Sequence, residues 1–103
     1  MKKSATFLLL IILTACAAVK LTQPVPSDLE KMQQKVPSIT YEQALSGFNL
    51  YRSKCNGCHG LHRPAEFTME KWEKILPEML AKAKLSDPQE KENLTNYLKA
   101  NSK

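Results

Sequence analysis

Two cysteines and a histidine stand close together in the sequence, as Cys55, Cys58 and His59. The Cys-x-x-Cys-His spacing is compatible with three kinds of chemistry. The thiols could attach a haem covalently while the histidine ligates its iron, they could bind zinc together with histidine, or they could form a redox-active dithiol. Each alternative needs a different context, which the rest of the chain has to supply.

The zinc and dithiol alternatives fit this context poorly. A structural zinc site has four ligands, and the only nearby fourth candidate is His62, which gives a cramped cluster without the second half of a zinc finger. A thioredoxin-like dithiol needs a βαβ setting, and residues 40–103 contain no alternating strand pattern of useful length. The pattern therefore favours one haem c, attached through Cys55 and Cys58, with His59 as an iron ligand.

The N-terminal residues have the features of an export signal. Lys2 and Lys3 precede an apolar run at residues 7–13 that is too short to span a bilayer comfortably. Covalent attachment of haem belongs to the exported compartment, so this signal agrees with the Cys-x-x-Cys-His pattern. We expect residues 1–15 to be a signal peptide.

Residues 13–16, Leu-Thr-Ala-Cys, resemble the lipobox of bacterial lipoproteins. In such proteins the signal is removed just before the cysteine, which then carries lipid. The resemblance implies lipidation of Cys16 and attachment to the periplasmic face of a bacterial membrane. Ala17, in place of an aspartate, favours the outer membrane over the inner one.

Residues 16–39 are polar and punctuated by prolines, and we expect them to form a lipid-anchored tether. A short helix is expected inside it, because Leu29, Met32 and Val36 recur at helical spacing. Loss of residues 1–15 removes two lysines and lowers the formal net charge from +5 to +3. This mild basic bias is too weak to indicate nucleic acid binding.

Residues 40–103 predict an all-α domain. The first helix begins after Thr40, which forms a capping box with Gln43, and it runs into Cys55. Its apolar face carries Tyr41, Ala44, Leu45, Phe48 and Tyr51.

Two further helices are expected after the cysteine motif. The second opens at Thr68, and Pro77 should kink or restart it. Its apolar stripe consists of Trp72, Ile75, Leu76, Met79, Leu80 and Ala83. The third begins at Ser86, where Gln89 completes a capping box and Pro88 occupies the permissive first turn.

The domain of residues 40–103 is small. A hydrophobic core of that size rarely contributes more than about 3–5 kcal/mol of net stability without a covalent or metal staple. A haem would supply the missing apolar centre. We therefore expect three short helices wrapped around one covalently bound haem c.

Residues 40–100 resemble a class I cytochrome c of the small monohaem, bacterial lipoprotein type. The resemblance rests on Gly47, Leu50 and Tyr51 ahead of the cysteine motif, and on the closing Leu94-x-x-Tyr97-Leu98. It implies that the first and last helices cross at a glycine and aromatic residues. It also implies a methionine sulfur as the second axial ligand of the iron.

Met79 is the preferred candidate for that ligand. It follows Pro77 and shares a face with Trp72, which could form part of a wall against the porphyrin. Met69 is only ten residues past His59, so the chain between them would have to cross the haem edge almost at once. Met32 is a remote third option. A methionine that only fills the core is the structural alternative.

Two residues that follow the motif have expected roles near the haem. His62 is only three residues from His59, so one segment cannot readily place both on opposite haem faces. We expect it to be exposed or near a propionate. Pro64 is expected to mark the turn whose carbonyl accepts a hydrogen bond from the Nδ1–H of His59.

The expected function is one-electron transfer by a membrane-anchored monohaem cytochrome with His/Met-ligated iron. No acid, base or nucleophile constellation accompanies the motif, so catalysis is not expected. A haem enzyme or gas sensor with an open sixth position is the alternative. Arg52, Lys54 and Arg63 flank the motif and could favour an acidic redox partner.

Overall fold

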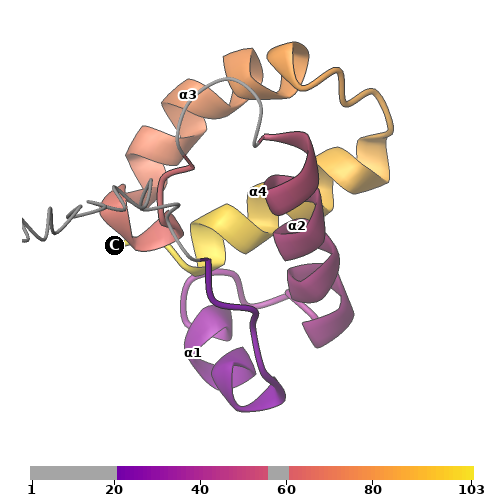
Figure 1. The fold of residues 1–103 in the computed structure, drawn as a ribbon. Coiled ribbons are helices and arrows are strands. Elements are labelled where there is room, and N and C mark those ends of the chain that lie inside the picture. The colour runs from indigo at the N-terminus through magenta and orange to yellow at the C-terminus, as the bar shows by residue number, and fades with distance from the viewer. Residues whose placement is uncertain (1–20, 56–60) are drawn as a thin grey trace, which may run out of the picture.

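The computed structural model describes residues 21–55 and 61–103, and the secondary structure in these ranges is entirely helical (Figure 1). The elements in chain order are η1 (Pro26–Asp28), α1 (Leu29–Gln33), α2 (Tyr41–Lys54), η2 (Pro64–Glu66), α3 (Met69–Lys82) and α4 (Pro88–Ala100). The prediction of an all-α fold is confirmed. The predicted signal peptide, Cys16, Cys58 and His59 lie outside the described residues.

Local hydrogen bonds explain where the three longer helices begin. Thr40 and Gln43 form the predicted capping box, with the Thr40 Oγ1 accepting from the Gln43 backbone N–H at 3.2 Å. Thr68 caps α3 in the same way, since its hydroxyl accepts from the Lys71 N–H. The prediction for α4 was wrong by one residue. Asp87 is the N-cap, because its carboxylate accepts from the Gln89 N–H at 3.0 Å.

The centre of the fold is the crossing of α2 over α4 (Figure 1). At Gly47 the two helices come so close that an added Cβ would collide with the carbonyl oxygen of Asn93 and the Cβ of Tyr97. Phe48 and Tyr97 meet edge to face beside this glycine, with ring centroids 6.0 Å apart. The predicted crossing at a glycine and aromatic residues is confirmed.

Helix α3 packs on α4 and continues through Pro77 to Lys82. The helix does not restart at this proline, so that alternative was wrong, and the alternative of a kink stays a prediction. A proline removes one backbone hydrogen bond from the helix. Trp72 and Leu76 are both buried in the core just before it, and this packing holds the helix across the missing bond.

Part of the predicted tether is folded onto the domain. Met32, Val36 and Ile39 are buried, and with Ala44 of α2 and Ala100 of α4 they form a second apolar cluster. Helix α1 therefore lies against the N-terminal end of α2 and the C-terminal end of α4 (Figure 1). No helix among the described residues is long and apolar enough to cross a membrane.

Candidate haem site

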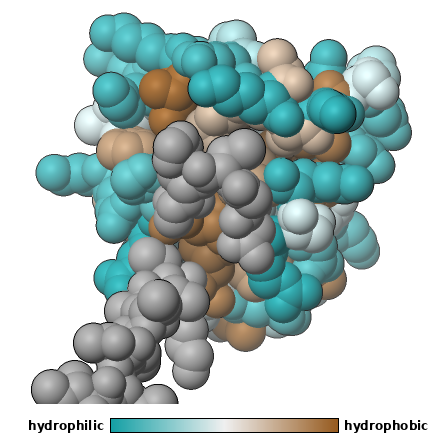
Figure 2. Space-filling model, turned by 45° about the horizontal axis from the view of Figure 1, so that its top comes forward, coloured by the Kyte–Doolittle hydropathy of each residue, from teal (hydrophilic) through white to brown (hydrophobic). Residues whose placement is uncertain are grey.

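A cavity of about 240 Å³ lies between the C-terminal end of α2, the segment after residue 60, and α3. Its lining residues are Tyr51, Lys54, Cys55, Leu61, His62, Ile75, Glu78, Met79, Lys82 and Ala83. Cys55 of the predicted attachment motif and the predicted ligand Met79 therefore line the same cavity. Figure 2 shows hydrophobic residues gathered among hydrophilic ones on one face of the molecule.

The three methionines in the described ranges lie in different surroundings. Met79 is partly exposed and lines the cavity. Met32 is buried in the second cluster, where its sulfur accepts a hydrogen bond from the Asn101 side chain, and Met69 packs against the same cluster. Among these three, only Met79 shares a cavity with Cys55.

The tertiary structure divides the single apolar stripe of α3 into two faces. Trp72 and Leu76 point into the main core. Ile75, Met79 and Ala83 recur every four residues and line the cavity. The sequence showed all of these residues at helical spacing. Only the position of α4 shows which of them face the core and which line the cavity.

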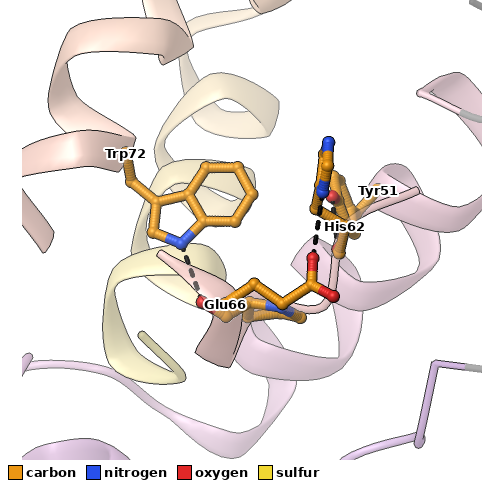
Figure 3. A network of polar contacts seen from close by, with 5 residues as sticks. Tyr51, His62, Glu66 and Trp72 are labelled. Atoms are coloured by element: carbon orange, nitrogen blue, oxygen red, sulfur yellow. Dashed lines mark hydrogen bonds and ion pairs between the residues drawn. The ribbon is translucent and has the colours of Figure 1, made fainter. Parts of the chain in front are cut away.

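Two buried aromatic residues hold the segment that follows the cysteine motif (Figure 3). The Tyr51 hydroxyl donates to the backbone carbonyl of His62 at 2.6 Å. The indole Nε1–H of Trp72 donates to the carbonyl of Pro64 at 2.9 Å. Tyr51 and Trp72 also meet edge to face, with ring centroids 6.1 Å apart. Sequence reasoning placed both residues on apolar helix faces and did not anticipate these bonds.

The structure locates the other predicted site residues as follows. Trp72 is fully buried against Tyr51 and Phe67 and does not line the cavity. Pro64 begins η2, and its carbonyl accepts from Trp72; the expected bond from His59 stays a prediction. His62 is exposed, as expected, and its Nδ1 lies 2.9 Å from the Glu66 carboxylate (Figure 3).

Charged side chains surround the cavity. Lys54 and Lys82 are exposed at its edge, and Lys82 pairs with Glu78 at 2.9 Å. The hydrogen bond from Lys82 lowers the pKa of the Glu78 carboxyl. Burial raises the pKa of the Tyr51 hydroxyl.

Comparison with known proteins identifies the chain. The family model of the dihaem cytochromes c matches residues 51–103. The chain belongs to the dihaem cytochrome c family. Searches of curated proteins and of solved structures returned no significant match.

Membership of the dihaem cytochrome c family establishes a c-type cytochrome and covalently bound haem c. The predicted resemblance to a c-type cytochrome is confirmed. The matching family is that of the dihaem cytochromes c, however, and not the monohaem class I. The sequence contains a single Cys-x-x-Cys-His motif. The described residues fit such a group, because a cysteine of the predicted attachment motif, a thioether and apolar side chains line one cavity.

Proposed function

We propose that this c-type cytochrome carries one haem c per chain and transfers single electrons. Cys55 and Cys58 would hold the haem, and His59 and Met79 would ligate its iron. The observation that carries the proposal is the shared cavity of Cys55 and Met79, which the other two methionines of the described ranges do not line. The single attachment motif supports one haem per chain.

The residues around the cavity suit an electron carrier. When bound, haem c supplies a one-electron iron couple. Leu61, Ile75 and Met79 present apolar side chains to the cavity, and a methionine ligand favours the reduced state and raises the potential. The proposal requires no residue to donate or accept a substrate proton, so we propose an electron carrier rather than an enzyme.

We further propose that the protein is exported and anchored by lipid at Cys16. The domain would lie on the periplasmic face of a bacterial membrane, and we favour the outer membrane over the inner one. The motif at residues 13–16 supports this placement. The redox partner would be an acidic protein. Arg52, Lys54 and Arg63 are exposed beside the cysteine motif and support that choice, since opposite charges accelerate association between electron-transfer partners.

The direct test is production of the full chain in a bacterium with working cytochrome maturation. The purified protein should gain the mass of one haem, and the oxidised sample should show the weak far-red sulfur-to-iron band. Met79→Ala should abolish that band, while Met69→Ala should retain it as the matched control. Carbon monoxide binding by the reduced wild type, with no sulfur-to-iron band, would instead favour the haem enzyme or gas sensor.

A further inference from the structure

We propose that Tyr51 and Trp72 are positioning residues for the sixth iron ligand. Through two hydrogen bonds, each donated by a buried side chain, they fasten residues 62–64 to both α2 and α3, and so fix the separation of the cavity walls that carry Cys55 and Met79. We refer to these two bonds as the aromatic clamp. The inference rests on the proposed ligation by Met79.

The geometry of the clamp joins two helices through one short segment (Figure 3). Tyr51 of α2 donates to the His62 carbonyl at 2.6 Å, and Trp72 of α3 donates to the Pro64 carbonyl at 2.9 Å. Both donors are almost fully buried, at 1% and 0% exposure. A buried donor that loses its acceptor cannot turn to water instead, so both bonds resist opening.

The clamp matters because α2 and α3 make few direct backbone contacts. In the described part of the chain, each of these helices packs mainly on α4. The edge-to-face contact of Tyr51 with Trp72 links them directly, and residues 62–64 link them through the two hydrogen bonds. Helix α4 and the clamp together therefore determine how far Cys55 lies from Met79.

The clamp leads to a measurable expectation for ligand exchange. A thioether is a weak, neutral ligand, and it stays bound only while its helix is held at the right distance. Loosening the clamp would let α3 shift, and an external ligand would then displace Met79 more easily. One hydrogen bond corresponds to roughly a three- to tenfold change in an equilibrium constant.

The experiment compares Tyr51→Phe with Tyr41→Phe in the haem-loaded protein. Tyr41 provides a matched control, because its hydroxyl also donates from α2 to a backbone carbonyl, that of Pro24, at 3.1 Å. The dissociation constant of imidazole for the oxidised protein is measured by optical titration. Urea unfolding is measured in parallel. Trp72→Phe serves as the second clamp variant.

We expect Tyr51→Phe and Trp72→Phe to lower the imidazole dissociation constant by roughly three- to tenfold. Tyr41→Phe should leave it unchanged even if it lowers stability. In a Met79→Ala background, the Tyr51→Phe effect should vanish, because no thioether then competes with imidazole.

Three results would overturn the inference: an unchanged constant in both clamp variants, an equal change in Tyr41→Phe, or a full Tyr51→Phe effect in the Met79→Ala background. The proposed ligation is tested separately. If Met79→Ala alone binds imidazole no more tightly than the wild type, Met79 is not the ligand and the clamp has nothing to position.

Discussion

Substitution of Gly47 by alanine tests the central contact of the fold. The new Cβ would overlap the carbonyl oxygen of Asn93 and the Cβ of Tyr97. Both atoms are fixed to the α4 backbone and cannot rotate away, so the two helices must separate. Overpacking of this kind costs about 1–3 kcal/mol, while replacing a mid-helix glycine by alanine returns roughly 0.5–1 kcal/mol.

Because the clash involves backbone, we expect the upper end of that range and a net loss of about 2 kcal/mol in the free energy of unfolding. For a domain of this size the melting temperature should fall by roughly 8–16 °C. Urea and thermal unfolding of the haem-loaded protein, followed by far-ultraviolet circular dichroism, would measure both quantities.

The matched control is Asn49→Ala, which places the same side chain on the exposed face of α2. It should raise stability by a few tenths of a kcal/mol through helix propensity alone. A Gly47→Ala protein at least as stable as the wild type would refute the close crossing of α2 and α4.

Three further predictions concern local features. Lys84, in the turn two residues after the end of α3, has a φ of 56°, a left-handed conformation that favours glycine. Lys84→Gly should therefore raise the free energy of unfolding by about 1 kcal/mol, whereas Lys84→Ala should not. Burial raises the pKa of Tyr97 to about 12, while an unfolded tyrosine ionises near 10. Stability should therefore fall as the pH rises from about 10 to 12, and Tyr97→Phe should fall less steeply in urea titrations across that range. Thr40→Ala removes the acceptor that caps α2 and should cost about 1 kcal/mol in chemical unfolding; an unchanged midpoint would contradict the capping role.

Much of the local structure was predictable because it depends on neighbouring residues. Thr40 and Thr68 act as caps through their own hydroxyl groups, and the helical spacing of apolar residues indicated α2, α3 and α4. The Asp87 cap was missed because Ser86 and Asp87 are both good capping residues. Only the position of Pro88 in the folded helix separates them.

The extent of the folded region was harder to predict. Residues 26–39 are rich in proline and polar residues, a composition that is typical of a tether. Met32, Val36 and Ile39 are nevertheless buried, because α2 and α4 together offer an apolar surface that none of these segments has alone.

The sequence by itself indicated the kind of site. Cys55, Cys58 and His59 lie within five positions, so their spacing indicates covalent haem attachment without knowledge of the rest of the fold. The tertiary structure decided which methionine lines the cavity of Cys55. Met69 and Met79 belong to one helix, and the packing of α3 on α4 places Met79 in that cavity and Met69 against the second cluster. The structure also produced the aromatic clamp, since Tyr51 and Trp72 are 21 positions apart in the sequence and meet only when α2, α3 and residues 62–64 pack together.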